Sequence, residues 1–426
     1  MQFLQSFICL LVFFTCSALS VPTRPQRKGR SFKVGRIRRS DYVPFGPAAL
    51  RKAYSKYGIT PTQFGLDILD FEPIKLKPFD SEASRNVSEP DQTGAVSAQS
   101  VQDDAEFVSP VMVGGQMMVM NFDTGSSDMW VFNTQLDERS TQGHTVFDPA
   151  KSATFQPMEG ASFNITYGDS SFAVGGVGTD TVNIGGATVT RQAIGLPTQV
   201  SQSFAEDTAS NGLVGLAFSS INTIQPQRQK TFFENVAPDL DEPVMTALLK
   251  SDGVGEYEFG TIDQSKFRGR MANISIDNSN GFWQFESAQF AVGRGPLQRI
   301  RAAPTAIADT GTTLMLVSPE VAAAYYEQVE GAVFANVAGG FIYPCDSALP
   351  DLSVAVGNAN LATVPGSLIN FSEVGTNTTN GQKICFGGVQ SNQGSGLQIY
   401  GDVFLKSMFV VFDQRGPSLG LASPAR

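Results

Sequence analysis

Short apolar runs, broken by Gly, Pro, Asn and Ser, follow one another along the chain from about residue 106 to its end. The clearest of them are 116–122, 162–167, 177–184 and 410–413, and their length and their aromatic and β-branched content are typical of strands. Few stretches have a helical period. The pattern therefore predicts an all-β protein built from many short, connected strands.

Two stretches favour helices. Residues 319–330 follow Ser318, a residue suited to the N-cap, and end at Gly331. The apolar side chains of this stretch share one helix face, which we interpret as core packing: Val321, Ala322, Tyr325 and Val329. Residues 48–57 are a shorter candidate, which Gly58 would end.

The first 20 residues are typical of a signal peptide. Residues 3–19 are apolar, and Ala18 and Ser20 place small residues at the −3 and −1 positions for cleavage after residue 20. The alternative, a membrane anchor, needs ~20 apolar residues with a basic flank that retains it. We therefore predict an exported protein without a membrane partner, with secretion favoured over delivery to a vacuole.

Charge divides the rest of the chain into two parts. Residues 21–91 hold 14 Lys and Arg against 8 Asp and Glu, a net of +6, whereas residues 92–426 hold 16 against 32, a net of −16. A basic leader on an acidic body suggests a propeptide that docks electrostatically, joined through a polar linker at 81–105. The alternative for residues 24–39, a nucleic-acid-binding arm, does not suit an exported acidic protein, so nucleic acid is not an expected partner.

The start of the mature chain lacks an obvious site for a dibasic-cutting enzyme. No adjacent pair of basic residues occurs between Ala53 and Asp103, although such pairs exist upstream of Ala53. We therefore expect the protein to remove its own propeptide.

Cysteine usage agrees with export. Cys9 and Cys16 leave with the signal peptide, so Cys345 and Cys385 remain as one expected disulfide, with a free buried pair as the alternative. Five Asn-X-Ser/Thr sequences permit glycosylation: Asn86, Asn164, Asn273, Asn370 and Asn377.

A repeated motif carries the candidate chemistry. Asp-Thr-Gly begins at Asp123 and again at Asp309, 186 positions later, each time after an apolar run. A second landmark, Leu-Val-Gly ending at Gly215 and Ile-Tyr-Gly ending at Gly401, keeps the same interval. A lone Asp-Thr-Gly would be an ordinary turn, but two copies in register predict a duplicated fold with one carboxylate in each half.

Most other chemistries lack their residues. His144, the one histidine in the chain, has no nucleophile-elbow sequence to accompany it and is predicted to be a surface loop residue. Histidine-rich or cysteine-rich zinc sites are excluded, and no Gly-rich phosphate loop opens a βα unit, so no metal or cofactor is expected. Carboxylates therefore remain as the candidate catalytic groups.

Two aspartates brought together could share one proton. Like charges ~3 Å apart cannot both ionise easily, so one pKa rises and the other falls. Such a pair can hold a water molecule, remove its proton and protonate a departing amine. The neighbouring motif residues are expected to support the pair, with the glycines shaping the turn and the hydroxyls tuning the charge: Thr124, Gly125, Ser126, Thr310, Gly311 and Thr312.

These residues closely resemble the pepsin-like aspartic proteases, from about residue 106 to residue 422. Residues 165–171 resemble the flap hairpin that closes over substrate, and Trp130 matches the tryptophan that packs near the flap tyrosine. The resemblance therefore assigns flap and substrate-binding roles to Trp130, Tyr167, Gly168, Asp169 and Ser170. Residues 212–218, 401–404 and the single late disulfide look most like the fungal penicillopepsin, endothiapepsin and aspergillopepsin type.

The resemblance implies a mainly antiparallel, bilobal fold with a pseudo-twofold axis and an active-site cleft between the lobes, at residues 92–268 and 269–426. It implies a monomeric endopeptidase, active in acid, that cuts proteins or peptides between large hydrophobic residues and is inhibited by pepstatin. Asp169 would admit Lys before the cut bond. Lys56 and Tyr57 match the propeptide pair that covers the catalytic acids in the zymogen.

Two other hypotheses make different demands on the sequence. A catalytically silent binding protein of the same fold would be expected to lose one acid or the flap tyrosine, and this chain keeps all three. A two-carboxylate glycosidase would not need duplicated Asp-Thr-Gly turns.

Overall fold

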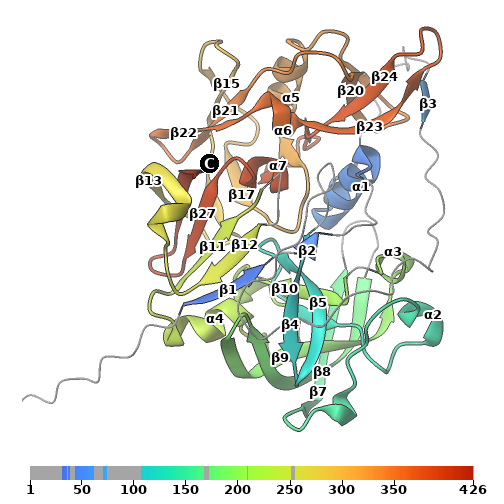
Figure 1. Ribbon diagram of the computed structural model, residues 1–426, viewed down its shortest axis with the longest axis vertical. Coiled ribbons are helices and arrows are strands. Elements are labelled where there is room, and N and C mark those ends of the chain that lie inside the picture. Colours follow the sequence, from blue (N-terminus) through green and yellow to red (C-terminus); the bar gives the residue numbers. More distant parts are fainter. Residues whose placement is uncertain are drawn as a thin grey trace, which may run out of the picture.

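The computed structural model describes residues 31–35, 37–38, 44–61, 71–73, 107–166, 172–208, 210–250 and 255–425. The expected signal peptide, the linker at 81–105, Asn86 and the flap residues 167–171 lie outside this part of the chain. The described residues are mostly β-strand, as predicted, and Figure 1 shows two lobes, one coloured cyan to green and the other orange to red.

The first lobe is built on one eight-stranded sheet, in which β4 also pairs with β8. Its strands, in sheet order, are β2 (Ile37–Arg38), β4 (Phe107–Val113), β5 (Gln116–Asp123), β10 (Gly212–Gly215), β6 (Met129–Val131), β9 (Ala187–Val200), β8 (Phe172–Ile184) and β7 (Gln156–Thr166). Strands β7 and β8 are the two arms of the predicted hairpin and run further than the sequence pattern indicated.

The second lobe contains three smaller sheets. The first, in order, is β14 (Gln284–Glu286), β17 (Thr305–Ala308), β26 (Gln398–Tyr400), β18 (Met315–Val317) and β25 (Val389–Ser391). The second is β16 (Gln298–Arg299), β15 (Gln289–Val292), β21 (Leu352–Val356) and β22 (Asn360–Val364). The third is β19 (Val333–Ala335), β20 (Gly340–Pro344), β24 (Lys383–Gly387), β23 (Asn370–Asn377) and β3 (Phe71–Pro73).

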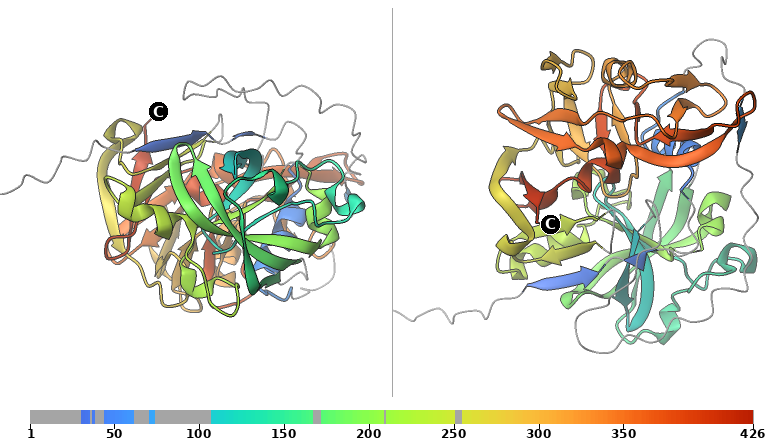
Figure 2. Two further views of the ribbon diagram at one scale, coloured as in Figure 1. Left: turned by 90° about the horizontal axis from the view of Figure 1, so that it is seen from below. Right: turned by 45° about the horizontal axis from the view of Figure 1, so that its top comes forward.

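A six-stranded sheet joins the lobes. Its order is β1 (Phe32–Gly35), β12 (Glu256–Phe259), β11 (Val244–Leu248), β27 (Phe409–Asp413), β28 (Ser418–Pro424) and β13 (Phe267–Ser275). Figure 2 shows the red C-terminal strands beside the yellow-green ones from the middle of the chain. The last strands of the protein therefore complete a sheet begun by its first half, and the expected boundary at residues 268 and 269 falls inside β13.

The helices are short. They are α1 (Gly46–Lys56), α2 (Glu138–Thr141), α3 (Gln202–Glu206), α4 (Phe232–Val236), α5 (Pro319–Tyr326), α6 (Gly366–Ile369) and α7 (Asp402–Leu405), with 3₁₀ turns at Pro149–Lys151, Ser219–Ile221, Ala237–Asp239 and Gln264–Lys266.

Helix α5 is shorter than the predicted 319–330. After Tyr326 the backbone tightens, because the N–H groups of Gln328 and Val329 bond the carbonyls three residues before them. The expected apolar face is nevertheless right, since all four of its side chains are buried.

The hydrophobic core continues across the lobes. Trp283 of the second half is fully buried, and its indole N–H donates to the Leu216 carbonyl of the first half at 3.0 Å. Its ring also packs against Phe218 at 4.6 Å and Phe412 at 5.2 Å between centroids. Burying a large aromatic ring contributes about 2–3 kcal/mol, so this contact holds the halves in one arrangement.

Helix α1 lies where the two lobes meet (Figure 1). Pro47 stands in its first turn, and Gly58, with a φ of 63°, follows its last turn. Ala49, Leu50, Ala53 and Tyr54 form its buried face, and the Tyr54 hydroxyl donates to the Ser391 carbonyl at 2.7 Å. The described parts of the N-terminal segment, residues 21–91, are thus held on the second lobe by helix α1 and by the pairing of β3 with β23, and on the first lobe by the pairing of β2 with β4.

No helix in the described part of the chain is both long and apolar enough to cross a membrane. The expected disulfide is present, since Cys345 and Cys385 are bonded with an S–S length of 2.04 Å.

Candidate active site

Asp123 and Asp309 occupy equivalent places in the two halves. Asp123 ends β5, which runs parallel to β10, with Gly215 as its register partner. Strand β17 likewise runs parallel to β26, and the Asp309 N–H, one residue after β17, donates to the Tyr400 carbonyl at 3.1 Å. The two landmarks that share the 186-residue interval are therefore the two parallel partner strands.

The threonines after the aspartates bind the two halves together. The Thr124 N–H donates to Thr310 Oγ1 at 3.1 Å, and the Thr310 N–H donates to Thr124 Oγ1 at 3.0 Å. Each hydroxyl in turn donates to a carbonyl of the opposite half, Thr124 to Ala308 and Thr310 to Phe122, both at 2.8 Å. All of these groups are buried, so every bond is needed to satisfy a group that water cannot reach.

Glycine is required on both turns by the closeness of the opposite aspartate. A Cβ on Gly125 would lie 2.6 Å from Asp309 Oδ1, and a Cβ on Gly311 would overlap Asp123 Oδ1. The same glycines donate backbone N–H bonds to their own aspartates, at 2.8 and 2.9 Å. The turns therefore bring the two carboxylates together at the junction of the halves, as the repeat predicted.

The hydroxyl after each turn behaves differently in the two halves. Ser126 Oγ donates to Asp123 Oδ2 at 2.7 Å, as expected. Thr312 Oγ1, expected to do the same for Asp309, makes no well-aligned hydrogen bond among the described residues, although it is close enough to help lower the pKa of Asp309. The Tyr57 hydroxyl donates to Asp309 Oδ2 at 2.6 Å instead.

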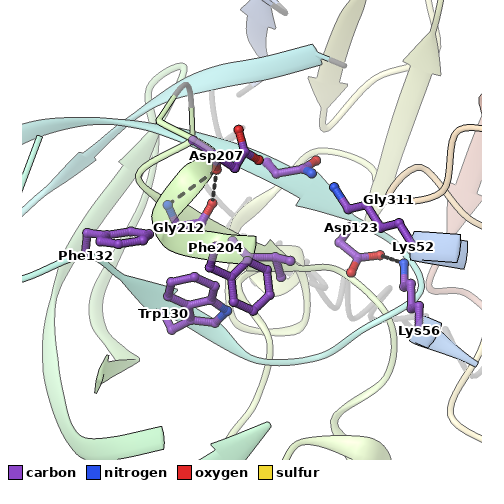
Figure 3. A pocket seen from close by; sticks show the side chains of 12 residues that line it. Lys52, Lys56, Asp123, Trp130, Phe132, Phe204, Asp207, Gly212 and Gly311 are labelled. Atoms are coloured by element: carbon purple, nitrogen blue, oxygen red, sulfur yellow. Dashed lines mark hydrogen bonds and ion pairs between the residues drawn. The ribbon is translucent and has the colours of Figure 1, made fainter. Parts of the chain in front are cut away.

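Lys56 covers both carboxylates. Its Nζ lies 2.6 Å from Asp123 Oδ1 and 2.9 Å from each oxygen of Asp309, and its side chain is 9% exposed. Figure 3 shows this ammonium group beside Asp123. The two residues at the end of α1 therefore occupy the space between the aspartates.

The two aspartates differ in acidity. Burial raises the pKa of Asp123, assisted by the charge of Asp309 and opposed by that of Lys56. Burial also favours the neutral form of Asp309, but the Lys56 charge and the surrounding hydrogen bonds outweigh it and hold the pKa of Asp309 at about 2. Burial works against the cation of Lys56 too, yet the two carboxylates raise the pKa of this group. The pair is thus suited to holding one proton between them.

A pocket opens beside Asp123 on the side of the first lobe. Its apolar wall consists of Trp130, Phe132, Phe204 and Leu213, and Lys52 and Lys56 border it from the N-terminal segment. Figure 3 shows the Trp130 and Phe204 rings next to one another, with centroids 5.1 Å apart. Trp130 Nε1 has no hydrogen-bond partner in the described ranges, and its expected neighbour Tyr167 lies outside them.

The sequence gave no pocket role to two of the lining residues. Phe204 lies 81 positions after Asp123 and reaches the pocket only through sheet topology, whereas Leu213 was noted only as the start of a repeated landmark. Asp128 is buried and accepts bonds from the Asn222 side chain at 3.1 Å and from the Thr223 N–H and hydroxyl at 3.1 and 3.0 Å. The signal that could have pointed to Asp128 was its place five residues after Asp123, inside the first repeated motif.

His144 was expected on the surface, and that expectation is wrong. The residue is in a loop, but it is half-buried, because its ring stacks on Phe132 and both ring nitrogens face backbone carbonyls. Among the described residues, no three His, Cys, Asp or Glu side chains are grouped to hold a metal ion.

The family model of the eukaryotic aspartyl proteases matches residues 106–424, a stretch that contains both Asp-Thr-Gly motifs. The chain therefore belongs to the eukaryotic aspartyl protease family and is an aspartic-type endopeptidase.

Fungal relatives are similar over nearly their whole length. A protein of Aspergillus fumigatus named as an aspergillopepsin A-like aspartic endopeptidase is 63% identical over 429 residues, which cover 100% of both chains. Aspartic protease PEP3 of Coccidioides posadasii is 53% identical over 421 residues, covering 97% of this chain and 94% of its own. Aspergillopepsin-1 of Aspergillus oryzae is 42% identical over 422 residues, covering 99% of each.

Proposed function

We propose that the protein is a secreted acid endopeptidase, made as a zymogen, in which Asp123 and Asp309 activate a water molecule. The ionised member of the pair takes a proton from the water, whose oxygen attacks the peptide carbonyl carbon. The protonated member gives its proton to the carbonyl oxygen, which forms a tetrahedral diol. The aspartate that took the proton of the water then gives it to the departing nitrogen as the C–N bond breaks, and a diol hydroxyl returns a proton to the other aspartate. No covalent intermediate, metal or cofactor is needed.

The contact of Lys56 with both aspartates carries the zymogen part of the proposal. An ammonium group between the carboxylates occupies the place of the attacking water, and Tyr57 takes the Asp309 oxygen that Thr312 would otherwise reach. Residues 21–91 would then be an inhibitory propeptide on a mature body of two lobes, 92–268 and 269–426.

Acid should release this segment in stages. Asp123, whose pKa is raised, takes up a proton first and removes one of the two charges that hold Lys56. The ion pair with Asp309 stabilises the docked state above the ordinary pKa of 3.8 and is lost only as the pH falls through about 2. Release at pH 3–4 therefore also depends on other contacts of the segment, such as the pairing of β1 with β12.

The apolar pocket supports a preference for large hydrophobic residues at the cut bond, since Trp130, Phe132, Phe204 and Leu213 offer it an apolar wall. We also propose that Asp169 admits Lys before that bond. Asp169→Ala should then lose cleavage after Lys and keep cleavage after Phe or Leu. If both activities fell together, Asp169 would serve the structure alone.

The deciding experiment is cleavage of a peptide library by the acid-treated full chain at about pH 3–4, with and without pepstatin. Pepstatin-sensitive cutting between hydrophobic residues is expected. A chain that binds pepstatin but cuts nothing would be a silent binding protein, and cutting that pepstatin leaves unchanged would assign the chemistry to other residues.

The zymogen is tested by Lys56→Met, with Arg51→Gln as the matched control, because Arg51 lies on the exposed face of the same helix. Removing the ammonium leaves two buried acids without their counter-charge, so activation at pH 5 should become roughly tenfold faster. Equal activation rates for Lys56→Met and the control would refute the inhibitory role.

Secretion and processing need a separate test. We propose that the propeptide is removed by the enzyme itself, so the Asp123→Asn chain should leave a host that lacks similar proteases with residues 21–91 still attached. N-terminal sequencing of the secreted protein reads this directly. We further propose a monomer carrying glycans at some of the five sequons, of which Asn164, Asn273 and Asn370 are exposed and Asn377 is half-buried.

A further inference from the structure

One wall of the apolar pocket comes from the connection between β9 and β10, whose described residues are 201–208 and 210–211. Its last residue, Asn211, is buried and bonded to β5, but helix α3 within it is five residues long and has no fully buried side chain. A helix this short gains little from its own hydrogen bonds. Phe204, Asp207 and Ser210 of this segment nevertheless line the pocket.

His144 contacts this segment at two points. Its Nδ1 lies 3.0 Å from the Ser210 carbonyl oxygen and its Nε2 lies 3.1 Å from the Ala205 carbonyl oxygen. One imidazole ring thus spans the turn that follows α3. The loop that carries it packs closely on the same turn, since a Cβ on the neighbouring Gly143 would come 2.9 Å from the Thr208 methyl group.

One face of the His144 ring contacts a residue that lines the pocket. His144 stacks on Phe132 with ring centroids 3.7 Å apart and an angle of 9° between the planes. Phe132 lines the pocket and packs against Trp130 at 5.7 Å. His144 therefore joins Phe132, which follows β6, to the segment that carries α3.

The chemistry of the ring suits acid conditions. A neutral imidazole has one N–H and can satisfy only one carbonyl, whereas the imidazolium donates from both nitrogens. Burial lowers the pKa of His144, and hydrogen bonds with the two carbonyls oppose that shift. Both carbonyls therefore accept a bond from the ring at the same time only when acid protonates it. The charged groups on the neighbouring elements are Asp137, Glu138 and Arg139 at α2, and Glu206 and Asp207 at α3.

We propose that His144 is a positioning residue for substrate selection: by bridging Ala205 and Ser210 while stacked on Phe132, it holds Phe204 against Trp130 and so shapes the pocket beside Asp123. This role rests on the proposed peptidase function. His144 touches neither aspartate, so the rate of bond cleavage on a bound substrate should be independent of it.

The test compares His144→Phe, which keeps the stacked ring and removes both donors, with His144→Gln, which keeps an amide donor. Gln142→Ala, an exposed change in the same loop, is the control. Two peptide series are measured at pH 3.5, with Phe or Ala at the position that enters the pocket. His144→Phe should raise KM for the Phe series roughly tenfold, leave kcat within about twofold and reduce the Phe-to-Ala preference, with His144→Gln in between.

An unchanged Phe-to-Ala preference in His144→Phe, with only a lower Tm, would make His144 a structural residue and overturn the proposal. Equal losses for both series would do the same. A second measurement does not require activity: hydrogen exchange in the Asp123→Asn background should become faster at residues 201–212 in His144→Phe and stay unchanged in β8. If the wild-type chain cut neither series, the proposed function would fail, and the exchange result would still decide whether His144 holds the segment.

Discussion

The two copies of the repeated motif, Asp123–Val131 and Asp309–Val317, share a frame but not their details. Each places an aspartate after a strand, a glycine at the closest approach of the halves and a threonine bonded across the junction. The copies differ five and seven positions after the aspartate. Asp128 of the first copy corresponds to Leu314 of the second, and Trp130 corresponds to Leu316; all four side chains are buried. The frame makes the dyad symmetric, and the departures give the first copy a wall of the apolar pocket at Trp130 and a buried acid at Asp128, where the second copy has leucines.

The N-terminal segment sharpens this difference. Helix α1 packs on the second lobe. There the Tyr57 hydroxyl donates to Asp309, whereas in the first lobe the hydroxyl of the motif itself, Ser126, donates to Asp123. The comparison teaches that duplication supplies equivalent positions, while neighbours from elsewhere in the chain decide what each position does.

The largest effect should come from the position that the halves share completely. Asp123→Asn and Asp309→Asn should each lower kcat by roughly 10⁴-fold, because one amide removes the shared proton on which both roles depend. The measurement is peptide cleavage at pH 3.5 after the N-terminal segment has been removed by an added protease. Asp277→Asn, an exposed change, should leave kcat unaltered, and substantial activity in either dyad variant would contradict the equivalence of the halves.

The cross-bonded threonines test the frame itself. Thr124→Val and Thr310→Val keep the shape but each leave a buried N–H and a buried carbonyl without partners, so each should lower the free energy of unfolding by about 3–5 kcal/mol. Urea unfolding of the two variants, with exposed Thr145→Val as control, measures this. If one substitution strongly lowered the free energy of unfolding and the other did not, the two halves would contribute unequally to the junction despite their equivalent hydrogen bonds.

Asp128 should make stability depend on pH in a way that its counterpart Leu314 cannot. Burial raises the pKa of Asp128 from 3.8 to about 6. A raised folded-state pKa stabilises the protein below the unfolded value and loses that effect as the pH rises through the folded value, so about 3 kcal/mol should disappear between pH 4 and 6.

Asp128→Asn should remove most of this slope while leaving the acceptor oxygen in place. Thermal unfolding at intervals between pH 3.5 and 7 follows it, with Asp277→Asn as the exposed control. An unaltered slope in Asp128→Asn would assign the pH dependence to other groups.

The smallest effect separates the two hydroxyls. Ser126→Ala removes a well-aligned bond to Asp123 and should cost about 1–2 kcal/mol, whereas Thr312→Val removes a buried hydroxyl that lacks a well-aligned partner and should cost less while Tyr57 is docked. Unfolding of the full chain compares them. An equal cost for both changes would mean that Tyr57 does not replace Thr312 at Asp309.

Much of the site could be predicted because its signals are local or repeated. The Asp-Thr-Gly turns, the strands that lead into them and the matching landmarks depend on neighbouring residues, and the equal spacing revealed the pairing of the halves. The pairing of Lys56 and Tyr57 with the acids followed from resemblance. The length of helix α5 was missed because Pro319 and Gly331 mark its ends, whereas tighter backbone bonds end it at Tyr326.

By itself, the sequence determined which segments form strands, where the two acids lie and that they belong to equivalent halves, because period, turn residues and repeats are properties of neighbours along the chain. Only the tertiary structure set the distances at which Lys56, 253 positions before Asp309, lies between the acids, buried Asp128 against Asn222 and Thr223, and placed His144 between Ala205 and Ser210. Those outcomes depend on distances between remote segments and on the water excluded around them. Sheet topology sets both.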